Sequence, residues 1–167
     1  MCIRDSVDTT LTSLTGSGGQ FSFGKQSGQF TYELGTYFLT PNLELNNQGF
    51  LMNTDQIEQW SRAQYRINKP FSIFRMMSFR FVQSHSLDFG GRSLNSWVNL
   101  RANAQFKNFW QYAMGANFRY LNRSNADLRG GPSITYPGQS NFWFFAGTDT
   151  RKKLVLEYNN WLSLIHI

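Results

Sequence analysis

The chain has 167 residues, of which 16% are charged and 17% aromatic, and it carries a formal net charge of +6. The charged share is well below the roughly 25% of an ordinary soluble domain, while the abundance of aromatic residues argues against a disordered chain. The longest apolar run, Phe142–Ala146, is far shorter than the ~20 residues that a membrane-spanning helix needs, which excludes a helical membrane protein.

The two ends of the chain are related through the genetic code. One codon choice for Met1–Ser6 is ATG TGT ATA AGA GAC AG, and its reverse complement encodes Leu-Ser-Leu-Ile-His-Ile, the sequence of residues 162–167. We therefore expect both hexapeptides to be translated from a sequencing adapter. Segments of this kind do not belong to the fold. The protein itself is then expected at 7–161, as a fragment truncated on both sides and without Cys2, the only cysteine.

Alternation of apolar and polar residues predicts about eight long β-strands and no helix. In chain order the strands are expected at Gly19–Phe23, Gln29–Thr40, Asp55–Asn68, Phe71–Ser86, Leu94–Phe106, Phe109–Leu121, Asn141–Thr148 and Leu154–Trp161. The alternation is clearest in Leu94–Phe106, where one phase is almost entirely Leu, Val, Ala and Phe and the other is mostly Asn, Arg and Gln. In Phe71–Ser86 both phases contain apolar residues, so the faces of that strand are not assigned.

The connections between these strands alternate in length. Short turns are predicted at Gly24–Gly28, Asn68–Pro70, Lys107–Asn108 and Thr150–Lys153, and longer loops at Pro41–Thr54, Leu87–Arg92 and Leu121–Gly138. Such alternation places all the short turns at one end of an up-and-down sheet, as in outer-membrane barrels. A strand of about fourteen residues at ~3.3 Å each and ~45° tilt rises roughly 30 Å, which covers the ~25 Å apolar band of such barrels.

We therefore predict an all-β fold, an up-and-down antiparallel meander that forms an incomplete segment of an outer-membrane β-barrel. One phase of each strand is expected to face lipid and the other to face the lumen. The lipid-facing candidates are Leu94, Val98, Leu100, Phe106, Trp110, Tyr112, Met114, Phe118 and Tyr120, and the lumen-facing candidates are Arg62, Arg66, Asn99, Arg101, Asn103, Asn117 and Arg119. A soluble β-sandwich or β-barrel with one buried face is the alternative, because it alternates in the same way.

The lumen-facing candidates predict a net positive, asparagine-rich interior. The alternative is that these arginines pair with acidic residues of strands that lie outside this chain. Nucleic-acid binding is not expected, because the arginines and the aromatic residues mostly occupy opposite phases, so bases could not stack where phosphates are neutralised.

The sequence predicts no catalytic residue, no metal site and no cofactor. Without the two end segments, His85 is the only histidine, and no second histidine or cysteine completes a zinc set. Glu44, Asp55 and Glu58 lack the spacing of a calcium loop, and we interpret them as surface carboxylates. Two glycine pairs lack the strand and helix of a nucleotide-binding loop and are interpreted as turns, namely Gly90-Gly91 and Gly130-Gly131.

Several short motifs, taken in order, resemble a known family. They are Ser22–Gly28, Thr40–Leu51, Phe106–Trp110, Arg129–Pro132 and Thr148–Lys152. In this order they resemble the C-terminal region of the family catalogued as domain of unknown function 5916, whose members are often labelled carbohydrate-binding family 9 domain-containing proteins. The resemblance covers most of Gly16–Trp161 and departs at Asn47-Gln48, where an Asp-Leu pair is more typical.

The resemblance implies an outer-membrane β-barrel of a Gram-negative bacterium, preceded in longer members by a carbohydrate-binding domain. The expected partners are outer-membrane lipid and, through that further domain, glycans. The family has no established catalytic residues to carry over, so the sequence does not identify an enzyme. Two alternatives fit the same barrel, namely a substrate-uptake receptor or porin and a protein of the glycoside-hydrolase type.

Overall fold

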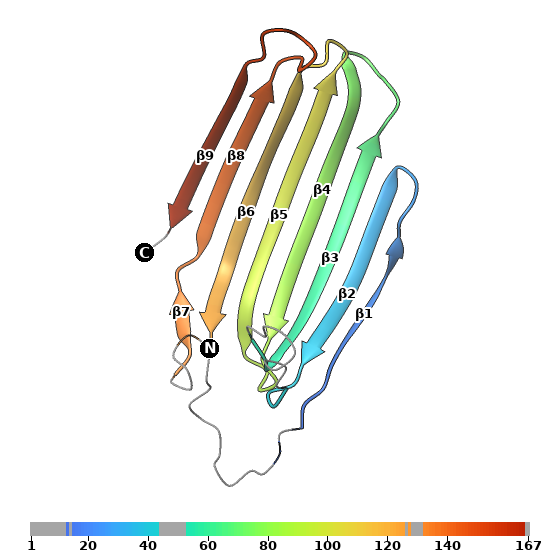
Figure 1. Ribbon diagram of the computed structural model, residues 1–167. Coiled ribbons are helices and arrows are strands. Elements are labelled where there is room, and N and C mark those ends of the chain that lie inside the picture. The colour runs from blue at the N-terminus through green and yellow to red at the C-terminus, as the bar shows by residue number, and fades with distance from the viewer. Residues whose placement is uncertain (1–12, 14, 44–52, 126, 128–131, 166–167) are drawn as a thin grey trace.

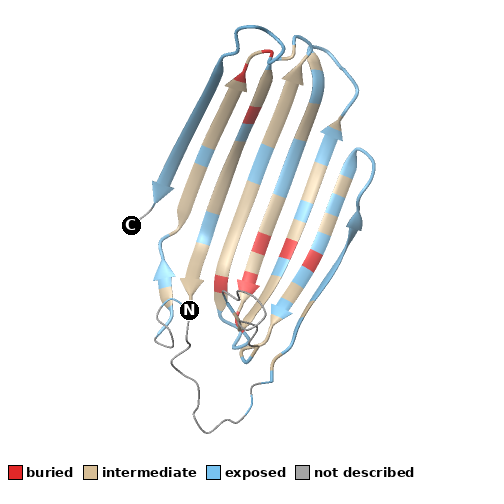
Figure 2. Cartoon of the chain, in the orientation of Figure 1, coloured by how far each residue is buried: buried red, intermediate tan, exposed pale blue. Residues whose placement is uncertain are grey.

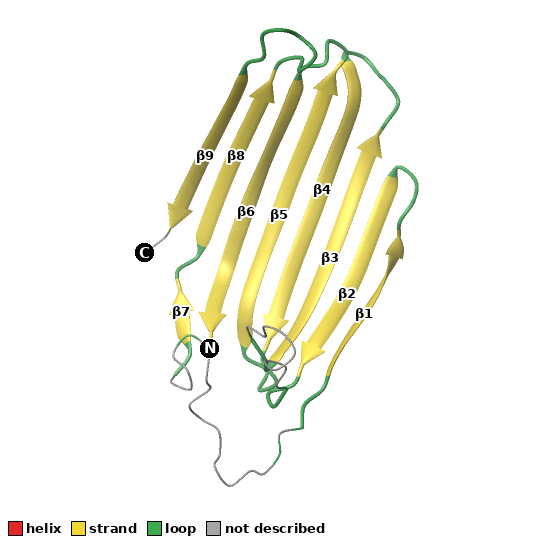
Figure 3. Cartoon of the chain, in the orientation of Figure 1, coloured by secondary structure: helices red, strands yellow, loops and turns green. Residues whose placement is uncertain are grey.

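The structure is a computed structural model that describes residues 13, 15–43, 53–125, 127 and 132–165. These residues form one antiparallel sheet of nine strands in the order β1-β2-β3-β4-β5-β6-β8-β9, with β7 paired to β6 (Figure 1). The strands are β1 Gly18–Lys25, β2 Phe30–Leu39, β3 Gln56–Ile67, β4 Phe74–Leu87, β5 Ser93–Phe106, β6 Gln111–Ser124, β7 Ile134–Tyr136, β8 Gln139–Gly147 and β9 Glu157–Ile165. The described residues contain no helix, and hence none that could cross a membrane (Figure 3).

The prediction of an all-β antiparallel meander is confirmed for the described residues. Each predicted strand has a counterpart in the sheet, and the boundaries of most differ by only a few residues. One observed strand was not predicted: β7 lies inside the predicted loop at Leu121–Gly138. Three residues are too few to show a period of two, so this strand is created by its pairing with β6 and not by a local pattern.

The connections lie at the two ends of the sheet as predicted, but their lengths do not alternate strictly. Residues 26–29, 68–73, 107–110 and 148–156 connect strands at one end, which we call the turn end, and the other connections lie at the loop end (Figure 1). At the loop end, residues 88–92 form a shorter connection than 148–156 at the turn end. The predicted long loop after Leu87 is therefore a tight turn.

Asp88 explains why this loop-end connection is tight. Its Oδ1 accepts a hydrogen bond from the backbone N–H of Arg92 at 2.7 Å, and its Oδ2 accepts one from Arg92 Nε at 2.8 Å. Burial raises the pKa of the Asp88 carboxyl, but the hydrogen bonds and charge of Arg92 outweigh this and hold the pKa below its usual value. Gly91, at φ +79°, confirms the turn predicted at Gly90-Gly91, whereas Gly130-Gly131 lies outside the described residues.

The strand register defines two faces of the sheet. Directly opposed residues of neighbouring antiparallel strands share a face. One transverse row is Tyr65–Phe79–Ala102–Met114–Phe144, and the next row, on the other face, is Gln64–Arg80–Arg101–Gly115–Trp143. We call the face of the first row the apolar face and that of the second row the polar face.

The apolar face is not covered by a second layer of described protein. On it, Met114 is 52% exposed and Leu100 is 44% exposed. The buried strand residues, shown red in Figure 2, are Gly35, Trp60, Ser84, Ser86, Leu94, Ala113 and Gly147, and all but Leu94 lie on the polar face. A β-sandwich would bury its apolar face under a second sheet, whereas the described residues form a single sheet.

Candidate functional site

The residues that the sequence assigns to a lumen all lie on the polar face. Arg62 and Asn99 both lie directly opposite Val82, and Arg66 and Asn103 both lie directly opposite Ser78. The remaining three are placed by the pairing of β5 with β6: Asn117 opposite Asn99, Arg101 opposite Gly115 and Arg119 opposite Trp97. The predicted clustering on one face is thus observed, while the lumen itself stays a prediction.

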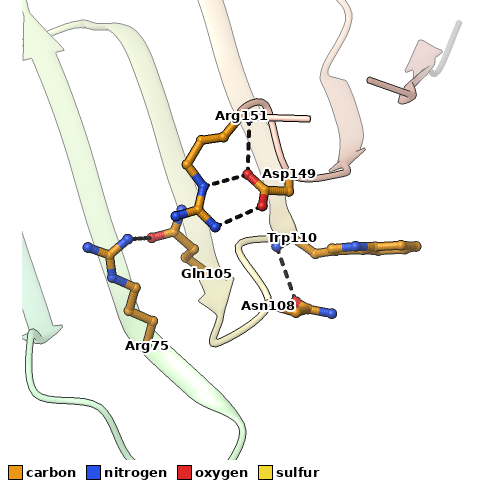
Figure 4. Close-up of polar contacts among 6 residues, drawn as sticks. All are labelled: Arg75, Gln105, Asn108, Trp110, Asp149 and Arg151. Atoms are coloured by element: carbon orange, nitrogen blue, oxygen red, sulfur yellow. Dashed lines mark hydrogen bonds and ion pairs between the residues drawn. The ribbon is translucent and has the colours of Figure 1, made fainter. Parts of the chain in front are cut away.

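Most of the residues assigned to lipid lie together on the apolar face. The register places six of them there, namely Val98, Leu100, Phe106, Tyr112, Met114 and Phe118. Leu94 and Tyr120 lie instead at register shifts, where one strand carries an extra residue, and Leu94 is only 7% exposed. Trp110 lies in the turn before β6, where its backbone N–H donates to Asn108 Oδ1 at 3.2 Å (Figure 4).

Four arginines of three adjacent strands, Arg62 and Arg66 of β3, Arg80 of β4 and Arg101 of β5, lie near one another on the polar face. We call them the arginine cluster. Arg80 lies directly opposite Arg101, and like charges in that position destabilise a sheet. The guanidinium groups of Arg66 and Arg80 donate to the same atom, Gln64 Oε1, at 3.1 and 3.4 Å. Two unit charges about 6 Å apart repel by roughly 0.7–3 kcal/mol, depending on the effective dielectric constant.

The arginine cluster has few acidic partners among the described residues. Arg62 pairs with Glu33 at 3.3 Å, the one ion pair of the cluster in this part of the chain. Arg101 Nε donates to Asn103 Oδ1 at 3.0 Å, and the Arg101 guanidinium lies 5.3 Å from the ring centroid of Trp143. Three of the four guanidinium groups are thus held by neutral groups.

Two of these cluster features were not predicted from the sequence. Arg80 was missed because both phases of its strand contain apolar residues, so period two does not assign its face. Trp143 was missed because it lies within the apolar run Phe142–Ala146. It packs over Gly115 of β6, where a Cβ atom would lie 2.5 Å from the indole ring. Only the pairing of β6 with β8 brings this ring beside Arg101.

A polar groove opens along part of the arginine cluster. Its volume is about 400 Å³. Its lining includes Lys25, Thr31, Glu33, Arg62, Gln64, Arg66 and Arg80. With four basic side chains and a single carboxylate, this groove attracts anions.

A second polar cluster surrounds Glu58 toward the loop end of the polar face. The Glu58 carboxylate accepts hydrogen bonds from Ser84 Oγ at 2.7 Å, from Tyr37 OH at 2.8 Å and from Gln56 Nε2 at 3.1 Å. The interpretation of Glu58 as a surface carboxylate holds only in part, because the residue is half-buried and donors of β2, β3 and β4 surround its carboxylate. Asp55 accepts from the backbone N–H of Phe89 at 3.0 Å, and Glu44 lies outside the described residues.

Three buried polar atoms near Glu58 have no hydrogen-bond partner among the residues that the structure describes. They are Trp60 Nε1, Ser86 Oγ and Asn95 Oδ1. Ser86 lies directly opposite both Glu58 and Asn95, so these atoms belong to adjacent positions of one sheet region. A buried polar atom without a partner costs free energy.

Ser84 and Ser86 are both almost fully buried on the polar face and provide a matched pair of substitutions. Ser84→Ala is expected to lower the free energy of unfolding by about 1.5–3 kcal/mol, because it removes a hydrogen bond to a carboxylate. Ser86→Ala is expected to leave it unchanged or raise it by up to about 1 kcal/mol, because its hydroxyl has no partner in the described part of the chain. Denaturant midpoints in detergent micelles measure the difference, and equal losses for the two variants would contradict it.

The turn end is held by stacked charged and aromatic groups. The Asp149 carboxylate accepts hydrogen bonds from Arg151 Nε and Arg151 Nη2, both at 2.8 Å (Figure 4). The Arg151 guanidinium lies 3.2 Å from the ring centroid of Phe109, and Arg75 lies 4.6 Å from the same centroid. Arg75 also donates to Gln105 Oε1 at 3.3 Å. These cation–π contacts link the start of β4 to the turns before β6 and β9.

Asp149 makes the turn end sensitive to acid. Hydrogen bonds from Arg151 lower the pKa of its carboxyl to about 2, against an opposing effect of burial, whereas an unfolded aspartate titrates near ~3.9. The contribution of this pair to stability is complete above the unfolded pKa and is lost as the pH falls toward about 2. We expect Asp149→Asn to lower the melting temperature at pH 7 and to have a much smaller effect at pH 2, where about half of the folded carboxyl is already protonated. An equal effect at both pH values would contradict the assignment.

The described residues contain no cluster of side chains that could hold a metal ion. No three His, Cys, Asp or Glu side chains of this part of the chain come together. His85 lies on the apolar face, opposite Gln59 of β3 and Ser96 of β5.

Comparison with known protein families shows to which family the chain belongs. The model of one family matches residues 4–166. The chain belongs to the family described as domain of unknown function (DUF5916). The resemblance carried by the sequence motifs is thereby confirmed, while neither a curated protein nor a solved structure matches the chain.

The family match extends into both of the segments assigned to adapter, and the sheet extends into the second of them. Leu162–Ile165 continues β9 and pairs with β8 as far as Gln139. An alternating apolar segment of any origin can extend an antiparallel ladder in this way, so the adapter assignment stays a prediction. Residues 1–6 lie outside the described residues.

Proposed function

We propose that this member of the DUF5916 family forms part of the wall of an outer-membrane β-barrel, with its apolar face toward lipid and its polar face toward the interior. The observation that carries the proposal is a single sheet with one face of exposed large apolar side chains and one of arginine and asparagine. Exposed apolar patches of this kind mark surfaces that meet a membrane or a partner. A lipid environment meets the apolar face without requiring a second layer of protein.

The apolar band has the dimensions of a membrane-spanning strand. In β5 it runs from Phe106 to Val98, which matches the ~9–11 residues that a tilted transmembrane strand needs. Beyond it, toward the loop end, the next row of the same face is polar in three adjacent strands, with Ser96, His85 and Gln59 directly opposed. This change of polarity supports a hydrocarbon boundary near Val98.

Aromatic rings border the band at its other side. A row of six rings crosses the sheet near the turn end, with centroids of successive rings 4.8–6.4 Å apart, and it consists of Phe71, Phe74, Phe106, Tyr112, Phe144 and Tyr158. Girdles of aromatic residues flank the apolar band of outer-membrane barrels, whose short turns face the periplasm. This arrangement supports an orientation with the loop end outside the cell.

The function that this arrangement supports best is passage or uptake of solutes through a positively charged interior. The basic residues of the polar face outnumber its acidic residues in the described strands, since Arg62, Arg66, Arg80, Arg101 and Arg119 lie with Glu33, Glu58 and Glu157. Charged side chains of a barrel lumen tune its selectivity. Ion-selectivity measurements on the assembled barrel are expected to show a preference for anions, and a cation preference would contradict this assignment.

Spin labels on adjacent residues test the orientation of the two faces. In a Cys2→Ser background, single cysteines replace Ala102 and Met114 on the apolar face, and Asn103 and Asn117 on the polar face. In phosphatidylcholine vesicles we expect labels at 102 and 114 to collide mainly with oxygen, which partitions into lipid. Labels at 103 and 117 should collide mainly with a water-soluble nickel complex. Equal access of the nickel complex to all four labels would overturn the proposal.

A further inference from the structure

We propose that the arginine cluster contains a defined binding site for solutes that carry a phosphate or carboxylate group. The site deepens the proposed function and rests on it only in taking the polar face as the water-filled interior. It consists of Arg66, Arg80 and Arg101, with Gln64 and Asn103 as neutral partners. The alternative is a diffuse positive potential without a site.

The side-chain oxygen of Gln64 accepts hydrogen bonds from two arginines and indicates where an anion would bind. The guanidinium groups of Arg66 and Arg80, on neighbouring strands, both donate to the single neutral oxygen Gln64 Oε1. An anionic oxygen in this region would accept the same donors through stronger, charge-assisted bonds. It would also offset the repulsion between the two cations, which a neutral amide oxygen does only weakly.

The third guanidinium group is held in place by its surroundings. Arg101 lies directly opposite Arg80 and is oriented by Asn103 Oδ1 on one side and the Trp143 ring on another. Trp143 itself packs against the backbone at Gly115. Groups that are ordered before binding lose less conformational entropy when the ligand arrives, which raises affinity.

Three arginines of the cluster are exposed and form no ion pair with a described carboxylate, so they are accessible to an anionic ligand. Glu33, the one carboxylate among the described residues that line the groove, is bound to Arg62 and not to the other three arginines. Arg66, Arg80 and Arg101 are all exposed to solvent, and the groove of about 400 Å³ runs beside the first two. Arginine presents a planar fork of donors that matches both carboxylate and phosphate oxygens.

Titration with two multivalent probes tests the site. The chain in detergent micelles is titrated with pyrophosphate and, separately, with citrate, at constant ionic strength set with potassium chloride. Binding is followed by tryptophan fluorescence, and a Trp143→Phe variant identifies the part of the signal that comes from the ring beside Arg101. We expect saturable binding of at least one probe. Arg80→Gln and Arg101→Gln should each weaken it at least about tenfold, the loss of roughly one charge-assisted contact.

Arg119→Gln is the matched control. It removes the same charge from the same face but lies opposite Trp97 and Gln139, away from the cluster, and should change affinity less than about twofold. Arg101→Lys keeps the charge but loses the planar fork, so an intermediate loss separates geometry from charge and provides a folded variant if Arg101→Gln does not fold.

The outcomes separate this inference from the proposed function. Equal weakening by Arg119→Gln, or no saturable binding of either probe beyond the effect of chloride, would overturn the site even if the spin labels confirm the two faces. Saturable binding that depends on Arg80 and Arg101 supports the site. Binding by only one of the two probes supports it as well and identifies the solutes as phosphate-bearing or carboxylate-bearing.

Discussion

Replacing Met114 by arginine is expected to lower the free energy of unfolding in lipid vesicles by about 2–4 kcal/mol, the cost of a basic side chain at the midplane of a barrel's lipid face. Met114 lies on the apolar face between Ala102 and Phe144 and is 52% exposed. If the same face met water, an exposed substitution would change stability by no more than about 0.5 kcal/mol. The magnitude therefore distinguishes lipid from water.

Asn141→Arg is the control for this substitution. Asn141 lies on the polar face of β8, opposite Asn117, so an arginine there is expected to change stability by less than about 0.5 kcal/mol. Urea midpoints of both variants in vesicles, followed by tryptophan fluorescence, provide the comparison. Equal effects of the two substitutions would contradict a lipid-facing apolar face.

The second large effect is expected at Gly115. A Cβ atom there would lie 2.5 Å from the Trp143 ring, so Gly115→Ala is expected to cost about 1–3 kcal/mol through overpacking. The substitution should also move Trp143 away from Arg101, and a change of the tryptophan emission reports this. Gly35→Ala, whose Cβ would lie 2.2 Å from Trp60, is expected to behave similarly.

A double-mutant cycle isolates the cause of this cost. Trp143→Leu removes the ring that meets the new methyl group, so the double variant Gly115→Ala/Trp143→Leu should lose less stability than the sum of the two single variants. Additive losses would contradict a steric clash between these two residues and would assign the cost to the backbone of β6.

The two predictions examine the two faces separately. Met114 tests what the apolar face meets, whereas Gly115 and Trp143 test how the polar face holds its arginines in place. The adjacent positions 114 and 115 point to opposite faces of β6, so their variants differ in environment while sharing strand and depth.

Local sequence determined the strands and the separation of two faces. The period-two pattern of Leu94–Phe106 depends only on the geometry of an extended chain, in which successive side chains point to opposite sides. The residues that it divides, such as Leu100 and Arg101, therefore lie on the predicted sides once any antiparallel pairing forms. The order of the strands within the sheet also followed from the sequence, because short connections favour pairing between strands that are neighbours along the chain.

Interactions between strands decided the arrangement on the polar face. Arg80 meets Arg101, Glu58 meets Tyr37 and Ser84, and Trp143 covers Gly115 only because the register aligns residues that are far apart along the chain. The extra residue at Leu94 likewise interrupts the pairing of β5 with β4, although the local alternation continues through it. Register depends on hydrogen bonding and packing between whole strands, and the alternation within a single strand does not specify these interactions. Sequence periodicity therefore determined which residues share a face, and tertiary structure alone decided which of them touch.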